Sequence, residues 1–305
     1  MPGILLLIIL LNFAKSYINL WYTLFWNNRR DYMNYKLIAI DMDGTLLNSQ
    51  NKISTRNILA IKKSADLGVK VVLTTGRIFT SALYYAKDLN INTPIIACNG
   101  AYIAEQDKSI IYLEDSMTLD AFENVINLAE KEGLYYHFYD DSSFFAKGLT
   151  KTVENYYRWN IDKKEKDRLN IRIVDKPLDV VRRENINVYK IVFVEDDSEK
   201  INTFKEKLSN IQGIEVSSSW WNNIEVMNKG VSKGYALNVL CQKFNIDGKN
   251  VMAIGDNEND ISMLKFAGKG IAMENGEGIV KEIADYVTDT NDESGVAKAI
   301  EKFVL

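Results

Sequence analysis

The chain has 305 residues, 47% hydrophobic and 26% charged, with a formal net charge of −4 at pH 7. This composition is ordinary for a globular protein, the length allows two domains or one domain with a large insertion, and the lack of a basic block argues against nucleic acid as a partner. His137 is the only histidine, and Cys98 and Cys241 lie far apart. Histidine triads and histidine or cysteine metal sites are therefore disfavoured, so any metal should be a hard ion on oxygen ligands, which points to Mg²⁺. The cysteines are expected to stay reduced, as in the cytoplasm.

The first 33 residues form an apolar leader that we predict to lie outside the fold. Residues 3–11 are almost wholly apolar, but Lys15 and other polar residues interrupt the span, and no cleavage site is evident. If residues 1–28 were a membrane anchor, Arg29-Arg30 would hold the following domain on the cytoplasmic side. The other two interpretations are a cleaved signal peptide and a membrane anchor. We favour a third, in which AGG codons for Arg29-Arg30 form a bacterial ribosome-binding site and translation starts at Met33. Peptides from residues 1–28 in mass spectra of the native protein would contradict it.

Residues 35–47 predict a buried strand that ends in acidic residues. The run from Leu37 to Ile40 is apolar and too short for a helix, which indicates a strand buried on both faces. Asp41, Asp43 and Gly44 follow at the carboxyl end, where open parallel sheets bind ligands. Because Asp41 and Asp43 flank one residue, we expect both side chains on the same face. Their repulsion predicts a metal cation, a raised pKa on one carboxylate, or both.

Helices and strands alternate from there to Gly100. Ser54 is predicted to cap a helix that ends near Gly68. The next predicted elements are a strand at residues 70–75, a helix at 78–89 and a strand at 94–98. Three strands that alternate with helices predict a parallel sheet with right-handed crossovers.

The pattern changes at about residue 113. Helical patterns mix with aromatic strands, which predicts a separate α+β unit; the helices are expected at 118–132 and 201–208, and the strands at 134–139, 188–194 and 214–218. The charged run at 162–167 is interpreted as solvated surface. The pairs Trp220-Trp221 and Tyr135-Tyr136 are interpreted as core or strand packing, and His137 as a packed or surface residue of this unit, although such a side chain could also lie over a substrate.

The α/β alternation resumes with a helix at 232–244 and a strand at 250–254, followed by Gly255 and the acidic run 256–260. The pattern therefore predicts one α/β unit that is split by an insertion. We predict that residues 34–113 and 228–305 form the core and that residues 114–227 form an inserted cap.

Four polar stretches are expected at the same edge of the sheet. They are Asp41-x-Asp43-Gly44-Thr45, Thr75-Gly76-Arg77, Lys233-Gly234 and Asp256-Asn257-Glu258-Asn259-Asp260. In this order, the four stretches resemble the motifs of the haloacid dehalogenase-like phosphatase superfamily, and the insertion between the second and third resembles its Cof-type subclass IIB. Residues 98–101, 230–234 and 270–275 also resemble that subclass. Asn275-Gly276 and residues 293–296 depart from its pattern but lie outside the catalytic set.

The resemblance implies a Rossmann-like, doubly wound parallel sheet with a large α+β cap, and a magnesium-dependent phosphatase. It implies that Asp41 attacks phosphorus and becomes an aspartyl phosphate, while Asp43 protonates the leaving alkoxide and then activates water. The like charge of Asp41 is expected to favour the protonated form of Asp43. Mg²⁺ would bind the Asp41 carboxylate, the Asp43 backbone carbonyl and Asp256, and Asp260 would orient a metal-bound water or Lys233.

The remaining site residues are expected to contact the phosphate or the substrate. The resemblance implies that the Thr75 hydroxyl, the Lys233 ammonium and the backbone N–H groups after Asp41 hold the phosphoryl oxygens. Gly76, Asn259 and Asn99 are expected as further phosphate or substrate contacts. Arg77 has two open interpretations, a substrate contact and a structural ion pair.

Other interpretations of these stretches are weaker. A calcium loop at residues 256–260 lacks the glycine and glutamate spacing of an EF-hand, and Lys233 alone would be an ordinary surface lysine.

We predict hydrolysis of a small phosphorylated metabolite, namely a sugar phosphate, a nucleotide or a phosphorylated cofactor. The alternatives are a phosphomutase and a phosphoacceptor module like a response-regulator receiver. Asp43 argues against the receiver, because an acid and base two residues after the nucleophile accelerates turnover. We expect a cytoplasmic monomer or small homo-oligomer without a membrane contact, unless residues 1–28 are an anchor.

Overall fold

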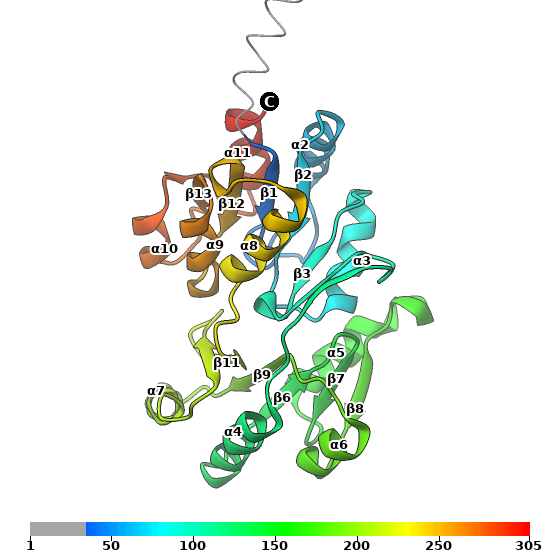
Figure 1. The fold of residues 1–305 in the computed structure, drawn as a ribbon, viewed down its shortest axis with the longest axis vertical. Helices are drawn as coiled ribbons and strands as arrows, with labels where there is room; N and C mark the ends of the chain where they lie inside the picture. Colours follow the sequence, from blue (N-terminus) through cyan, green and yellow to red (C-terminus); the bar gives the residue numbers. More distant parts are fainter. Residues whose placement is uncertain (1–34) are drawn as a thin grey trace, which may run out of the picture.

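The computed structural model describes residues 35–305, so the predictions for residues 1–33, including the start at Met33, lie outside the described residues. Two sheets with their helices occupy opposite ends of the molecule, and a small three-stranded sheet lies between them (Figure 1). Within residues 35–305, no helix has both the length and the apolar character needed to cross a lipid bilayer.

The first sheet has five parallel strands in the order β14-β13-β12-β1-β2. Its strands are β1 (Leu37–Ile40), β2 (Lys70–Leu73), β12 (Val251–Gly255), β13 (Lys269–Ala272) and β14 (Tyr286–Val287). Every residue of β1 is buried, as its apolar run predicts, and β1 pairs along its whole length with both β12 and β2.

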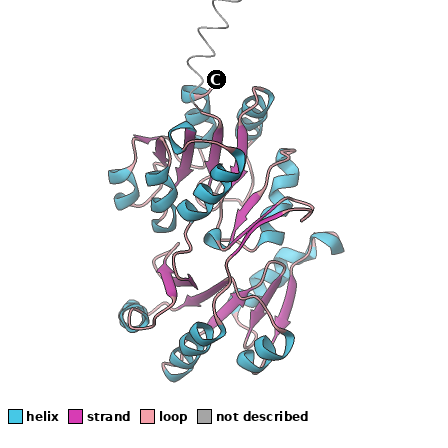
Figure 2. Cartoon of the chain, in the orientation of Figure 1, coloured by secondary structure: helices cyan, strands magenta, loops and turns pink. Residues whose placement is uncertain are grey.

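Helices cover both faces of this sheet (Figure 2). Alternate residues of β1 serve the two faces: Ile38 and Ile40 pack with α2, α3 and α11, whereas Leu37 and Ala39 pack with α8, α9 and α10. The bounds are α2 (Thr55–Asp66), α3 (Phe79–Leu89), α11 (Gly295–Phe303), α8 (Lys233–Phe244), α9 (Ile261–Phe266) and α10 (Gly278–Ile283). The predicted doubly wound core is therefore confirmed.

The predicted ends of α2 are also confirmed. The Ser54 side chain accepts a hydrogen bond from the Asn57 backbone N–H and so satisfies a free donor of the first turn. Gly68 follows the helix with φ of +87°, a left-handed conformation that glycine adopts without a steric penalty.

The strand predicted at residues 94–98 does not continue the parallel sheet. β3 (Ile95–Ala97) pairs with the residue that follows β2 through a single bridge, between Thr74 and Ile96. Otherwise β3 belongs to an antiparallel sheet in the order β3-β4-β5. Its partners are β4 (Tyr102–Ala104) and β5 (Ile111–Glu114). The cause is the short 3-10 helix η1 (Cys98–Gly100), whose three residues all have positive φ and turn the chain back on itself.

The second sheet has six strands in the order β10-β11-β9-β6-β7-β8, antiparallel except for the β7–β8 pair. Its strands are β6 (Tyr136–Tyr139), β7 (Ser143–Ala146), β8 (Asn170–Ile173), β9 (Lys190–Val194), β10 (Ile214–Ser217) and β11 (Asn223–Asn228). Its helices are α4 (Leu119–Lys131), α5 (Lys151–Ile161), α6 (Pro177–Glu184) and α7 (Ser198–Leu208). These elements form the α+β unit expected from the sequence, whose predicted bounds of 114–227 stay a prediction.

The two faces of the second sheet differ in chemistry. Phe138 and Phe193 belong to one face, which packs with residues of α4, α6 and α7 in a separate hydrophobic core. The opposite face carries His137 and Lys190 and lines a cavity shared with the first unit. This division follows from the alternation of side chains along each strand.

The interpretation of Trp220-Trp221 as packed residues is wrong. The two indoles are 60% and 64% exposed, because they lie in the turn before β11. Asn223 closes this turn by accepting hydrogen bonds from the Ser219 and Trp220 backbone N–H groups. Tyr136 and His137 are buried and Tyr135 is partly buried, as expected for packed residues.

Candidate active site

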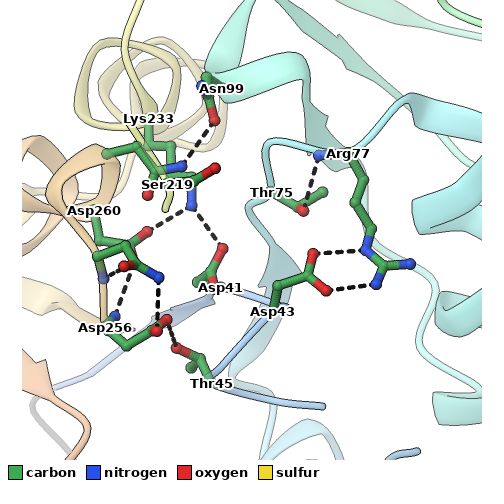
Figure 3. A network of polar contacts seen from close by, with 12 residues as sticks. Asp41, Asp43, Thr45, Thr75, Arg77, Asn99, Ser219, Lys233, Asp256 and Asp260 are labelled. Atoms are coloured by element: carbon green, nitrogen blue, oxygen red, sulfur yellow. Dashed lines mark hydrogen bonds and ion pairs between the residues drawn. The ribbon is translucent and has the colours of Figure 1, made fainter. Parts of the chain in front are cut away.

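The candidate site lies where β1 and β12 end side by side. Asp41 follows β1 and Asp256 follows β12, and because these strands are parallel neighbours, both carboxylates reach the same carboxyl edge. Lys233 approaches them as the first residue of α8, whose N-terminus is capped by Ser232 (Figure 3). The three side chains are almost fully buried.

Lys233 joins two of the acidic residues. Its Nζ donates hydrogen bonds to Asp41 Oδ1 and Asp260 Oδ1, both at 2.6 Å, and its side chain is only 1% exposed. Burial alone would lower the pKa of Lys233, but the Asp260 and Asp41 carboxylates raise it above its usual range. Lys233 is therefore held as a buried ammonium directly against Asp41.

Asp41, Asp256 and Asp260 form a compact acidic cluster. Each offers a carboxylate oxygen, and these oxygens all lie within 4.8 Å of one another. Burial, followed by repulsion from Asp260, raises the pKa of Asp41 to about 7. Burial, followed by repulsion from Asp41, raises the pKa of Asp256 to about 9. Three buried carboxylates share one ammonium, so without a metal ion they retain protons, and a divalent cation on oxygen ligands would take the place of those protons.

Neighbouring groups orient the Asp256 carboxylate. Thr45 Oγ1 donates to Asp256 Oδ1 at 2.7 Å, and Asn257 Nδ2 donates to Oδ2 at 2.8 Å. Gly44 has φ of +76°, and a Cβ atom there would lie 2.3 Å from Asp256 Oδ2. Only glycine therefore leaves room beside this carboxylate. The all-oxygen donor set fits a magnesium ion.

Asp43 forms an ion pair with Arg77 through both of its carboxylate oxygens. Its two oxygens accept hydrogen bonds from Arg77 Nη2 at 2.5 Å and Nε at 2.6 Å, while the Asp43 side chain stays 54% exposed. Surrounding protein atoms desolvate the carboxylate, which would raise the pKa of Asp43, but the Arg77 guanidinium lowers this pKa below its usual value. The expected protonation of Asp43 by repulsion from Asp41 is therefore wrong for this arrangement, in which Asp41 carries the raised pKa.

The loop after β2 brings Thr75, Gly76 and Asn99 together. Thr75 is buried and its Oγ1 accepts a hydrogen bond from the Arg77 backbone N–H at 3.1 Å. A Cβ atom at Gly76 would lie 2.8 Å from Asn99 Oδ1, which itself accepts a hydrogen bond from Asn259 Nδ2 at 3.2 Å. The residues predicted from four distant stretches thus meet at one edge of the sheet.

A cavity of about 240 Å³ connects these groups with the second unit. Asp41, Asp43 and Arg77 line one side, and a buried ion pair between Lys190 and Glu225 lines the other. The sequence interpretation missed this pair. Lys190 at the start of an apolar strand and Glu225 between apolar residues were the available signal, but nothing local indicated that the two residues meet.

Comparisons with known proteins agree with this geometry. A family model described as haloacid dehalogenase-like hydrolase matches residues 38–300. The chain is 35% identical over 277 residues to the 5-amino-6-(5-phospho-D-ribitylamino)uracil phosphatase YcsE of Bacillus subtilis. The aligned region covers 91% of this chain and 99% of that protein. It is 27% identical over 268 residues to the pyridoxal phosphate phosphatase YbhA of Escherichia coli, with 88% and 98% covered. A solved haloacid dehalogenase-like hydrolase from Bacillus subtilis matches with a TM-score of 0.79 and 30% identity, covering 87% and 99%.

Proposed function

The chain belongs to the haloacid dehalogenase-like hydrolase family, subclass IIB, and is a phosphatase, and we propose that it hydrolyses a small phosphorylated metabolite through an aspartyl phosphate on Asp41 with Mg²⁺. The observation that carries this proposal is the cluster in which Lys233 bridges Asp41 and Asp260 beside Asp256. It combines a nucleophile, a fixed cation and a donor set for a divalent ion at one strand edge.

Asp41 is the proposed nucleophile. Unaided hydrolysis of phosphate monoesters is slow enough that acceleration can reach about 10²¹, and a carboxylate nucleophile divides that reaction into two easier steps. Lys233 occupies Oδ1 of Asp41, so the second carboxylate oxygen is the one available to attack phosphorus. The Lys233 ammonium also lies where it can stabilise negative charge on the transferring group.

Asp43 is the proposed acid and base. It lines the same cavity as Asp41 and remains partly exposed, so it can meet the leaving oxygen of a bound ester. To donate a proton it must release Arg77 from at least one oxygen, since both carboxylate oxygens accept hydrogen bonds from the guanidinium. In this proposal Arg77 therefore binds the Asp43 carboxylate, and their ion pair is present before substrate binds.

The Asp41 and Asp256 carboxylates and the Asp43 backbone carbonyl are the proposed magnesium ligands, with Asp260 orienting Lys233 and the Asp256 loop. Bound magnesium would neutralise charge on the phosphoryl oxygens and on the carboxylates around them. Thr75, Gly76, Asn99 and Asn259 are the proposed phosphate and substrate contacts.

We further infer a core of residues 34–113 and 228–305 and a cap of residues 114–227. The cap sheet closes the cavity over Asp41, which excludes water and selects the leaving group. A cytoplasmic location is supported by the composition and by Cys98 and Cys241, which are buried free thiols.

Release of inorganic phosphate from p-nitrophenyl phosphate, with and without MgCl₂, tests the function. A phosphatase releases phosphate over many turnovers, a phosphomutase passes the group to a sugar, and a receiver-like module retains it. Failure to turn over any ester with magnesium would refute the proposal. A phosphate-release screen of sugar phosphates, nucleotides and phosphorylated cofactors then identifies the substrate.

A further inference from the structure

The side of the cavity that faces Asp41 is built by one face of the cap sheet. Glu225 on β11 is opposite Val192 on β9, and Val192 is opposite His137 on β6. Lys190, two residues before Val192, is opposite Tyr139. All five side chains therefore belong to the same face, and all five line the cavity.

Lys190 and Glu225 form an ion pair inside this cavity wall. Lys190 Nζ donates to Glu225 Oε1 at 2.7 Å, and the two side chains are only 3% and 4% exposed. Glu225 Oε2 also accepts a hydrogen bond from Asn99 Nδ2 at 2.7 Å, which links the cap to the loop beside Gly76. Burial alone would raise the pKa of Glu225, but Lys190 lowers it, so the carboxylate stays ionised.

Before substrate binds, each cation that lines the cavity has an anionic partner within residues 35–305. Lys190 is paired with Glu225, and Arg77 is paired through two hydrogen bonds with Asp43. His137 adds no charge near neutral pH, because burial and the Lys190 ammonium lower its pKa to about 3. Lys233, behind Asp41, is shared between Asp41 and Asp260.

The same wall still offers hydrogen bonds to neutral groups. An ammonium has three N–H donors, and Lys190 uses one for Glu225. The Tyr139 hydroxyl is already shared with His137 Nε2 and the Tyr156 hydroxyl. The Tyr156 hydroxyl and the Asn223 amide, whose Nδ2 donates one of its two N–H groups to Ser219 Oγ, also line the cavity and keep capacity for a further hydrogen bond. Such groups bind hydroxyl or amide substituents, whereas a second anion would be desolvated without a free cation to compensate it.

We propose that this cavity accepts an uncharged leaving group that bears hydroxyl or amide substituents, that it disfavours a leaving group with a second anionic group, and that Glu225 sets this preference by neutralising Lys190. The inference rests on the proposed phosphatase function and deepens it. The reaction itself is unchanged, so Glu225 is a specificity residue and takes no part in proton or phosphoryl transfer.

Two aryl phosphates of nearly equal shape test the preference in the full-length protein. In para-carbamoylphenyl phosphate the leaving group is neutral, and in para-carboxyphenyl phosphate it carries one negative charge. We expect kcat/KM of the wild-type protein to be about tenfold higher for the carbamoyl ester, the size of one uncompensated charge at moderate dielectric. Equal values, or a higher value for the carboxyl ester, would overturn the proposal.

Two variants separate a role in charge from a role in structure. Glu225→Gln keeps the shape but frees the Lys190 charge, so the ratio of carboxyl to carbamoyl kcat/KM should rise about tenfold. Lys190→Gln leaves Glu225 without its cation, so the same ratio should fall. A purely structural pair would lower kcat/KM for both esters alike and leave the ratio constant, which would refute the role of Glu225.

Glu132→Gln is the matched control. Glu132 also pairs with a lysine at 2.7 Å, Lys207, but on the cap surface. This variant changes the net charge as Glu225→Gln does and should leave the ratio unchanged; an equal shift would show a general charge effect and overturn the proposal. If no phosphate ester is hydrolysed in the presence of magnesium, the proposed function itself fails. If it is hydrolysed without the expected preference, only this inference fails.

Discussion

Replacement of Lys233 by methionine should strongly destabilise the protein. Lys233 Nζ lies 2.6 Å from an oxygen of Asp41 and 2.6 Å from an oxygen of Asp260, with all three side chains nearly inaccessible. Each pair interacts by about 6 kcal/mol at an effective dielectric constant of about 20, and desolvation of the three charges offsets much of that gain. Removal of the ammonium leaves the carboxylates buried without a cation, which costs about 3–5 kcal/mol.

Urea unfolding in EDTA, followed by tryptophan fluorescence and circular dichroism, measures this loss. Lys298→Met is the control, because Lys298 also makes a 2.6 Å ion pair, with Asp289, but at the surface. The surface pair should contribute only about 0–1 kcal/mol. Saturating MgCl₂ should reduce the loss in Lys233→Met, since a divalent cation restores positive charge to the cluster. Equal, small effects of the two substitutions would refute the assigned electrostatic role of Lys233.

Three further predictions concern the site and the cap. Asp43→Asn should lower kcat by about 10²- to 10⁴-fold, measured by phosphate release, with the smallest loss for esters of acidic alcohols that need no protonation. Gly44→Ala should raise the magnesium concentration needed for half-maximal activity, because the new Cβ would lie 2.3 Å from Asp256 Oδ2; Gly68→Ala, where φ is similarly positive but the space is open, should not. Burial lowers the pKa of His137 from 6.5 to about 3 in the folded state, so the unfolded chain binds the proton more readily between these pH values. The contribution of His137 to the unfolding free energy is therefore complete above pH 6.5 and is lost as the pH falls toward 3. His137→Phe should remove a pH dependence of up to about 1.4 kcal/mol per pH unit from the unfolding free energy in that window, and an unchanged slope would contradict the assignment.

The central sheet and the acidic edge were predictable because their signals are local. The apolar run before Asp41 specifies a buried strand, and the carboxyl ends of parallel strands must meet at one edge. That argument also places Asp256 beside Asp41 once β12 is recognised. Lys233 followed from the order of the motifs and from its position at the start of a helix.

Other features depend on contacts that no local pattern specifies. The orientation of Asp43 depends on Arg77, which is 34 residues away in the chain and captures both of its carboxylate oxygens. The reversal after β3 depends on positive φ at Cys98 and Asn99, and cysteine has no preference for that conformation. The Lys190–Glu225 pair exists only because β9 and β11 are neighbours in the cap sheet, a strand order that the sequence pattern does not reveal.

The most direct test of the mechanism is to trap the covalent intermediate. The protein is mixed with a turned-over ester and MgCl₂, denatured during steady state, and treated with sodium borohydride, which reduces an aspartyl phosphate to homoserine. Peptide mass spectrometry should find homoserine at position 41 only when substrate is present, and Asp41→Asn should show neither the trapped product nor turnover. Trapping at another residue, or sustained turnover by Asp41→Asn, would contradict the assignment of Asp41 as the nucleophile.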